Sequence, residues 1–270
     1  MNAFASSTEL AAALDKASQR GPQLLKELQD DWAQRQDTRE LLDAIGDITR
    51  QVLSDFGGVA AIDTLTAEIR ARLPEAAMTS ADPYRQAQAD RTAGGLLRVA
   101  LERVNEHENA TGQKDFVRRR HGRRLALLAT DELLIAAAES TAKRADEMVG
   151  SDHSVVIPPP TAARELGAAF QAGYRANSDD ADARTALPGE GRLIRLAAAI
   201  SKHAAVSGRG ELHNRDIAPA AAIQIALTGL AQSESLSPSQ IRSRVSARFP
   251  ELDRVPAPPH LDTYLAHMLT

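Results

Sequence analysis

The spacing of apolar residues constrains this chain most, because they recur at helical intervals in one segment after another. One such stripe consists of Leu41, Leu42, Ile45, Ile48, Val52 and Leu53. Apolar residues three and four positions apart line one face of a helix. Aromatic residues make up only 3% of the sequence, and alanine supplies much of the apolar content. Alanine favours helices but buries little surface, so the pattern predicts a mainly helical protein with small cores.

The segment 116–129 departs from the helical pattern. It reads FVRRR and RRLALLA around His121-Gly122, and two extended runs joined by a two-residue turn with glycine in second place are typical of a β-hairpin. A short β-like piece at 59–62 lies between two helical stripes, and a long helix that opens at Pro83 leads to the hairpin. Residues 38–130 are therefore predicted to form helix, strand, helix, helix and hairpin, which is the order of a winged helix-turn-helix domain.

An internal repeat links two distant segments. The sequence Ala-Arg-apolar-Pro-Glu closes a helical stripe at 71–75 and again at 247–251, and Ser237 with Gln240 predicts a capping box before the second stripe. This ending is also common in alanine-rich proteins, but the matched order of elements around it favours duplication. The second helix-turn-helix-like unit reaches Thr270 before a hairpin could form. Either this copy lacks its wing, or the chain is a piece of a longer protein.

The predicted organisation has four parts. They are an N-terminal helical segment over 1–37, a winged-helix-like domain over 38–131, a helical linker over 132–185 with a proline-rich connector at 154–161, and a helical domain over 186–270. The connector contains three consecutive prolines, which stiffen an extended chain. The fold class expected is mainly α, with two winged-helix-turn-helix-like units of which only the first has a wing.

The hairpin is also the strongest charge feature, with six basic residues and one acidic residue over 114–124. With a two-residue turn centred on its glycine, Arg120 would lie opposite Arg123, and Arg119 opposite Arg124. Like charges that face each other across strands are destabilising, and a phosphate backbone between them would relieve the repulsion. The alternative is a solvated, charged turn that protects a sheet edge.

The long helix before the hairpin adds arginines on its polar face, although Glu102 and Glu106 on the same helix reduce its positive charge. Aromatic side chains for base stacking are scarce, which argues against recognition of single strands. The predicted nucleic-acid-binding residues are Arg91, Arg98, Lys114, Arg118, Arg119, Arg120, His121, Arg123 and Arg124.

Other classes of site are not predicted. The chain has no cysteine, which excludes disulfides, thiolate zinc sites and cysteine nucleophiles, and fits a reducing compartment. Its seven histidines are dispersed, and the kinase-like triplet Asp55-Phe56-Gly57 ends a helix without a glycine-rich or His-Arg-Asp loop. The sequence shows neither a secretory signal nor an apolar run of about 18 residues. We expect a cytoplasmic, non-enzymatic protein without cofactor, metal or membrane contact.

Several stretches of the C-terminal half resemble one family. They are Leu193–Ala199, Ala204–Ser207, Ala226–Leu230 and Leu236–Glu251, followed by Pro256 and Leu261. These residues resemble the region downstream of the kinase domain in PglW-type serine/threonine kinases of phage-growth-limitation (BREX) defence systems, and 116–129 is similar to another segment of that region. The resemblance extends over most of 38–270 and implies antiviral defence. It does not imply kinase activity, because the kinase motifs are missing.

Two functions remain open from the sequence. The first is binding or sensing of nucleic acid, expected to be double-stranded DNA, through the basic hairpin. The second is a protein-interaction scaffold, or the regulatory region of a larger defence protein such as a kinase, with a partner docked on 218–270. The net charge of −4 and pI near 6.0 argue against a protein that coats nucleic acid along its whole length, but they permit a local basic patch.

Overall fold

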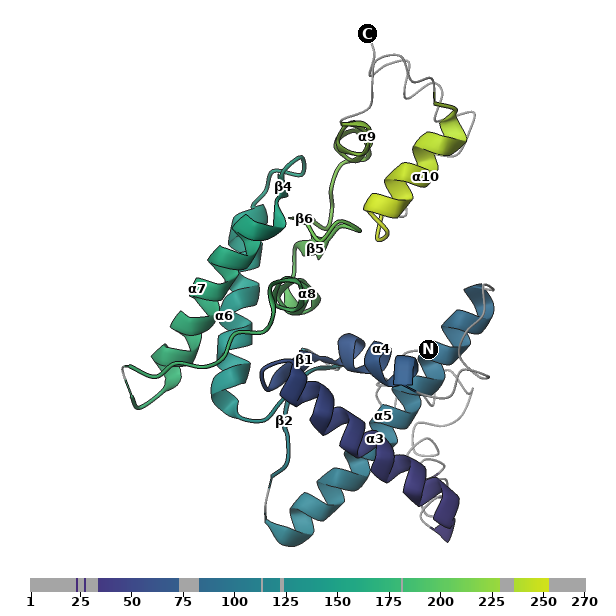
Figure 1. The fold of residues 1–270 in the computed structure, drawn as a ribbon, viewed down its shortest axis with the longest axis vertical. Helices are drawn as coiled ribbons and strands as arrows, with labels where there is room; N and C mark the ends of the chain where they lie inside the picture. Colours follow the sequence, from purple (N-terminus) through teal and green to yellow (C-terminus); the bar gives the residue numbers. More distant parts are fainter. Residues whose placement is uncertain are drawn as a thin grey trace. The chain divides into compact units, whose positions relative to one another are not determined.

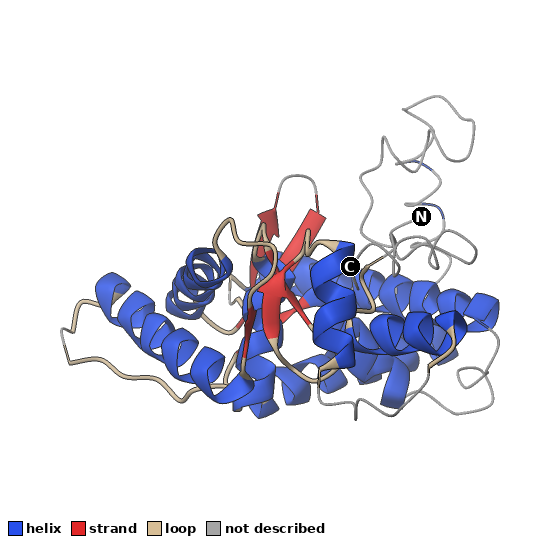
Figure 2. Ribbon diagram, turned by 90° about the horizontal axis from the view of Figure 1, so that it is seen from above, coloured by secondary structure: helices blue, strands red, loops and turns tan. Residues whose placement is uncertain are grey.

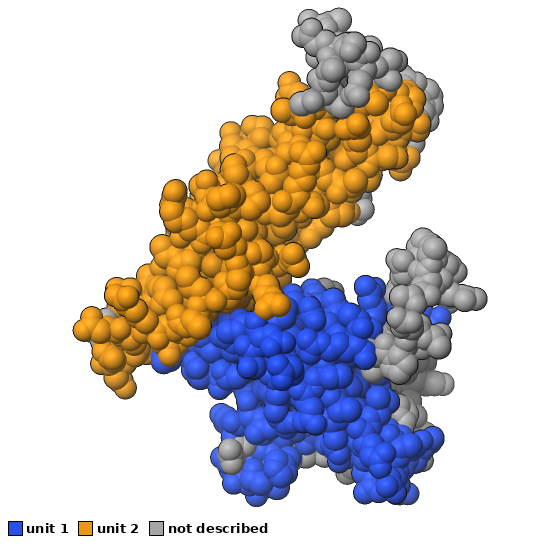
Figure 3. Space-filling view, in the orientation of Figure 1, with its two compact units in different colours: residues 1–135 blue, residues 136–270 orange. Residues whose placement is uncertain are grey.

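The computed structural model describes most of the chain between positions 34 and 252. The described residues are 23, 27, 34–72, 83–112, 114–121, 124–180, 182–228 and 236–252. The chain divides into two compact units, Met1–Ile135 and Ala136–Thr270 (Figure 3). Nearly all of the predicted N-terminal segment 1–37, and residues 253–270 of the predicted C-terminal domain, lie outside the described residues.

The protein is mainly helical, as the apolar spacing predicts. The described residues form eight helices and two small antiparallel sheets (Figure 2). No helix among them is long and apolar enough to cross a membrane.

The described residues of unit 1 form three complete helices and a three-stranded sheet (Figure 1). Its elements are α3 (Gln36–Asp55), β1 (Val59–Ala61), α4 (Ile62–Arg72), α5 (Pro83–Thr111), β2 (Val117–His121) and β3 (Arg124–Ala129). This is the predicted order of helix, strand, helix, helix and hairpin. The strands pair antiparallel in the order β1-β3-β2, so the first strand of the unit completes the sheet on the far side of the hairpin.

The core of unit 1 lies between α3, α4, α5 and the sheet. The predicted apolar stripes supply it, and its fully buried members include Ile45, Val52, Leu65, Leu97 and Leu128. The chain leaves α3 through Gly57 and Gly58, which adopt φ angles of 74° and 86°. Such positive angles favour glycine, and a Cβ at Gly58 would also lie 2.6 Å from Leu134 Cδ1. The two glycines therefore allow a tight turn from α3 into β1.

The hairpin exists where the sequence predicts it, but its register differs. Arg119 lies opposite Leu127 and Arg120 opposite Leu125, with an irregularity between the two arginines, and His121 faces Arg124. The predicted pairs of facing arginines are therefore wrong. The two residues that join the strands are those at 122 and 123, one position later than predicted, and the irregularity shifts the rest of β2 by a further residue. The argument from cross-strand repulsion does not apply.

Unit 2 contains most of α6 (Glu132–Val149), four further helices and a second three-stranded sheet. The other elements are β4 (Val156–Ile157), α7 (Pro159–Asn177), α8 (Glu190–Ile200), β5 (Ala204–Val206), β6 (Leu212–Asn214), α9 (Pro219–Leu227) and α10 (Pro238–Arg248). The sheet order is β4-β6-β5, again antiparallel. The predicted capping box of α10 is present: the backbone N–H of Gln240 donates to Ser237 Oγ, and that of Ser237 to Gln240 Oε1.

The second sheet joins segments that the sequence pattern assigns to different parts. Strand β4 lies in the predicted linker over 132–185, and it pairs with β6 in the predicted domain over 186–270. Strands β5 and β6 form a short hairpin that the sequence pattern does not predict. Strands of two and three residues are too short to show an alternating pattern, so their partners define them.

The two units repeat one order of elements. Each unit has a helix, a strand, two helices and a hairpin in that order: α3, β1, α4, α5, β2 and β3 in the first, and α6, β4, α7, α8, β5 and β6 in the second. In both sheets the last of the three strands lies in the centre. In this order α7, and not α10, corresponds to α4. The Ala-Arg-apolar-Pro-Glu repeat instead links α4 and α10, whose stripes are buried in both cases at Leu65 and Ile69 and at Ile241 and Val245.

Candidate nucleic-acid interface

The tip of the β2–β3 hairpin carries exposed basic residues. The side chains of Arg119, Arg120 and His121 are exposed at the end of β2, and Lys114 is exposed just before it. Arg124 begins β3, but its side chain lies outside the described residues, as does Arg123. The end of β2 thus brings together three of the predicted residues, and Lys114 lies before the other end of the strand.

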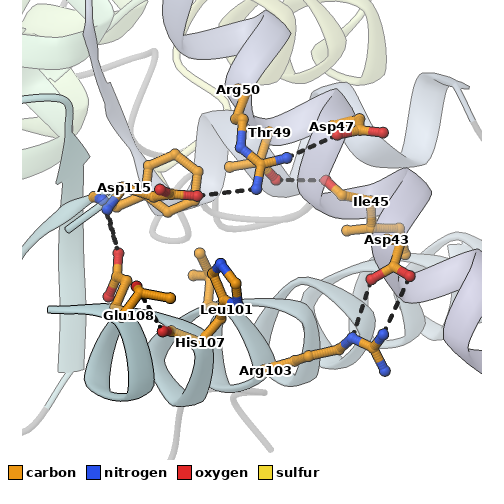
Figure 4. A network of polar contacts seen from close by, with 12 residues as sticks. Asp43, Ile45, Asp47, Thr49, Arg50, Leu101, Arg103, His107, Glu108 and Asp115 are labelled. Atoms are coloured by element: carbon orange, nitrogen blue, oxygen red, sulfur yellow. Dashed lines mark hydrogen bonds and ion pairs between the residues drawn. The ribbon is translucent and has the colours of Figure 1, made fainter. Parts of the chain in front are cut away.

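Arg118 has a structural role. Its Nη1 donates to Glu108 Oε2 at 2.7 Å and its Nη2 donates to the Leu101 carbonyl at 3.3 Å. Glu108 is buried, and its other oxygen accepts the backbone N–H groups of Asp115 and Phe116 at 2.7 and 2.9 Å (Figure 4). The carboxylate therefore anchors the chain at the point where it enters β2. Since a buried carboxylate requires its partners, Arg118 stabilises the charge of Glu108, and its predicted role in binding stays a prediction.

The arginines of α5 are also largely occupied. Arg98 Nε lies 3.0 Å from Glu102 Oε1, and Arg103 Nε lies 3.0 Å from Asp43 Oδ1 on α3. Arg91 is exposed near the start of the helix. Ion pairs along α5 leave it with a mixed charge, so of the two arginines predicted there, Arg98 belongs to a pair and only Arg91 extends the basic surface.

A groove of about 310 Å³ lies between α3 and α5. Arg50 Nη1 lies 2.7 Å from Asp47 Oδ1 and Nη2 lies 3.0 Å from Asp115 Oδ2, while Arg103 pairs with Asp43 (Figure 4). Each cation that lines the groove is matched by a carboxylate, so the groove does not form an anion site. In the part of the chain that the structure describes, no group of three acidic or histidine side chains could hold a metal ion.

Sequence reasoning missed a second basic surface, on α8 in unit 2. The exposed residues of this helix are Glu190, Gly191, Arg192, Arg195 and Ala199. Positions 192, 195 and 199 follow the i, i+3, i+7 spacing that places side chains along one face. The signal was present in the sequence as the polar complement of the stripe formed by Leu193, Leu196 and Ile200.

The β5–β6 hairpin of unit 2 packs against α10. The backbone N–H of Gly208 donates to the Arg248 carbonyl at 2.6 Å, and a Cβ at Gly208 would collide with the Ala247 carbonyl oxygen. Arg248 Nη2 donates to Glu211 Oε1 at 2.6 Å, and Arg248 Nη1 donates to the Ile225 carbonyl of α9 at 2.7 Å. These contacts hold the hairpin turn against the end of α10.

Two carboxylates of unit 2 are stabilised in their charged form. Burial opposes ionisation of Glu211, but hydrogen bonds from Arg248 and the Ser207 hydroxyl outweigh it and lower the pKa of this carboxyl. Burial likewise opposes ionisation of Asp146 on α6. There, hydrogen bonds from the Ser201 hydroxyl and from the backbone N–H groups of His203 and Lys202 lower the pKa.

Comparisons with protein-family models, with curated proteins and with solved structures found no match to this chain.

Proposed function

We propose that unit 1 is a winged-helix-like module that binds double-stranded DNA through the tip of the β2–β3 hairpin. The observation that carries the proposal is the exposure of Arg119, Arg120 and His121 at the end of β2, with Lys114 exposed before the strand. Basic side chains at a hairpin tip can contact phosphates on the outside of a duplex.

The arrangement of unit 1 supports the same reading. Its order of three helices with one strand before the hairpin, and the sheet order β1-β3-β2, are those of a winged helix-turn-helix domain. The hairpin takes the position of the wing. Because α5 carries balanced charges, the contacts at the wing are with the phosphate backbone, and binding has little sequence preference.

The alternative function, a scaffold that docks a partner on 218–270, depends on an exposed apolar surface there. In the described part of that segment, no large apolar side chain is exposed. The exposed large apolar side chains of the described residues are Leu41, Val155 and Leu187, which lie outside 218–270. Ile223, Val245 and Phe249 are buried against one another in the core between α9 and α10.

Antiviral defence is the setting that we propose for this activity, on the resemblance of 193–251 and 116–129 to the non-kinase region of PglW-type kinases. In a bacterium that depends on this protein for phage resistance, substitution of the hairpin arginines should restore plaque formation. Unchanged resistance would separate the defence role from DNA binding.

Binding of a labelled duplex by the full chain tests the function. The variant R119A/R120A/R123A/R124A should lose affinity, and the slope of log K against log salt between about 50 and 200 mM should flatten by about 0.9 for each phosphate contact removed. The variant R175A/R184A/R242A/R244A removes the same charge from exposed positions of unit 2 and serves as the control. Absence of wild-type binding at the lower salt, or an equal loss in the control, would overturn the proposal.

A further inference from the structure

The outer face of α8 carries two exposed arginines, Arg192 and Arg195. Arg195 forms no ion pair or side-chain hydrogen bond within the described residues, and its Nη2 would lie 3.7 Å from a Cβ at Gly191. The guanidinium therefore lies along the exposed helix surface, beside Arg192. From position 192 to the end of the helix, the only exposed residue besides these arginines is the small Ala199. The face is basic and has no bulky side chain that would keep a ligand at a distance.

The end of α8 extends this basic face and is fixed in place. Lys202 is exposed just beyond the helix, and its backbone N–H donates to Asp146 Oδ2 at 3.2 Å. Arg215 Nη2 donates to the carbonyls of Ala198 and Ala204 at 3.2 and 3.0 Å, so it satisfies backbone acceptors where the helix ends. Glu190 is the one exposed carboxylate of α8, in its first turn, and the aspartates at 179, 180 and 182 lie in the preceding connection.

The chemistry of this face fits duplex DNA. An α-helix with its side chains is about 10–12 Å across and the major groove is about 12 Å wide, so a helix with small exposed residues can approach the base edges. Arginine donates to phosphate oxygens, and in pairs of bonds to guanine. No aromatic side chain lies on the exposed face of α8, which argues against stacking on single-stranded bases.

The position of α8 in its unit supports the same partner. It is the helix that directly precedes the β5–β6 hairpin, as α5 precedes β2–β3. The turn of the unit 2 hairpin is held by α10 through Gly208 and Glu211, so that turn is engaged within the protein. The hairpin turn of unit 2 carries one exposed arginine, Arg209, whereas the exposed face of α8 carries two, Arg192 and Arg195.

We propose that the outer face of α8, with Arg192 and Arg195, is a second contact surface for duplex DNA, separable from the hairpin of unit 1. The inference rests on the proposed function for the identity of the ligand, but it concerns other residues in the other unit. The chain then binds DNA through a wing in one unit and a helix in the other.

The test compares R192A/R195A with the wild-type full chain in binding of a labelled duplex over a salt series. Loss of two contacts should weaken binding about tenfold or more, and flatten the salt slope by about two if both arginines contact phosphates. The variant R175A/R184A removes the same charge from exposed positions in the same unit. The variant R192K/R195K keeps the charge and should retain most of the salt slope. Circular dichroism and thermal unfolding establish that each variant is folded.

The outcomes separate this inference from the proposed function. A loss in R192A/R195A without a loss in R175A/R184A supports the α8 surface. If R192A/R195A binds like the wild type while the hairpin variant loses affinity, the inference is overturned and the proposed function stands. If the wild type does not bind duplex DNA at low salt, both fail. Equal losses of affinity in R192A/R195A and R175A/R184A would show that only the net charge matters, and would also overturn the inference.

Discussion

The hairpins of the two units have the same place in the order of elements but different lengths and surroundings. Strands β2 and β3 have five and six residues, and the tip that they form exposes basic side chains. Strands β5 and β6 have three residues each, and their turn packs on α10 through Gly208. The longer hairpin exposes the end of its first strand, whereas the turn of the shorter one contacts a neighbouring helix. Topology alone therefore does not assign a ligand to a hairpin.

The two units also share a way of anchoring the first strand of the hairpin. In unit 1, Glu108 accepts the backbone N–H groups of Asp115 and Phe116 just before β2. In unit 2, Asp146 accepts those of Lys202 and His203 just before β5. The first carboxylate comes from the helix that leads into the hairpin, the second from the first helix of its unit. The remaining partner is Arg118 in one case and the Ser201 hydroxyl in the other.

Removal of the Glu108 carboxylate should have the largest effect on stability. The substitution E108A leaves two backbone N–H groups and the half-buried Arg118 without their acceptor, and should lower the free energy of unfolding by about 3 kcal/mol. Urea denaturation of the full chain measures the change. The control D47A breaks an exposed ion pair with Arg50 and should cost less than about 1 kcal/mol. Equal effects of the two substitutions would show that Glu108 does not anchor the hairpin.

The arginines of the sequence repeat should differ in their contribution. Arg248 is nearly buried with Glu211, with side-chain exposures of 11% and 15%, whereas Arg72 pairs with Asp55 at exposures of 34% and 41%. We expect R248A to lower the free energy of unfolding by about 2 kcal/mol, because it leaves Glu211 partly buried and unpaired. R72A should cost less than about 1 kcal/mol. The same urea series measures both, and a larger cost for R72A would contradict the comparison.

The stability of unit 2 should fall in mildly acidic solution because of His213. This side chain is buried in β6, with its ring 5.0 Å from that of Phe249 in an edge-on contact. Burial is the main cause that lowers the pKa of His213, and the nearby charge of Arg215 lowers it further. The hydrogen bond to the Asn214 carbonyl and the charges of Glu251 and Glu211 act in the opposite direction but do not outweigh burial. Below the ordinary value of 6.5 the unfolded chain takes up the proton first, so stability falls as the pH decreases from there towards the lower pKa of the folded state.

The substitution H213Q tests this dependence, because glutamine does not titrate. Thermal unfolding between pH 7.5 and 5.5 should show a smaller loss of stability in H213Q than in the wild type, apart from its lower stability at neutral pH. The lowered pKa values of Asp146 and Glu211 act at a lower pH, where their protonation in the unfolded chain again favours unfolding. Identical pH profiles of the two proteins above pH 5.5 would exclude His213 as the cause.

Local patterns in the sequence predicted much of the fold. The stripes of α3 and α4, the proline at the start of α5, the capping box of α10 and the position of the β2–β3 hairpin all depend on residues within a few positions of one another. Strand β4 was not predicted because its pairing joins Val156 to His213 and Ile157 to Leu212, which lie far apart in the sequence. Strands β5 and β6 pair locally but have only three residues each. A strand of two residues has no pattern of its own.

The properties of the candidate site also depend partly on the local sequence and partly on the tertiary structure. The sequence by itself determined that basic residues gather at 114–124 and that a hairpin presents them, because charge and turn propensity are local properties. The tertiary structure alone decided which of them remain exposed. Arg118 is held by Glu108, ten residues earlier, and Arg119 and Arg120 face leucines across the hairpin. It also decided that α8 exposes its arginines in a unit whose hairpin turn contacts α10. Burial and ion pairing depend on distances between segments that no periodicity records, and these distances separate a binding arginine from a structural one.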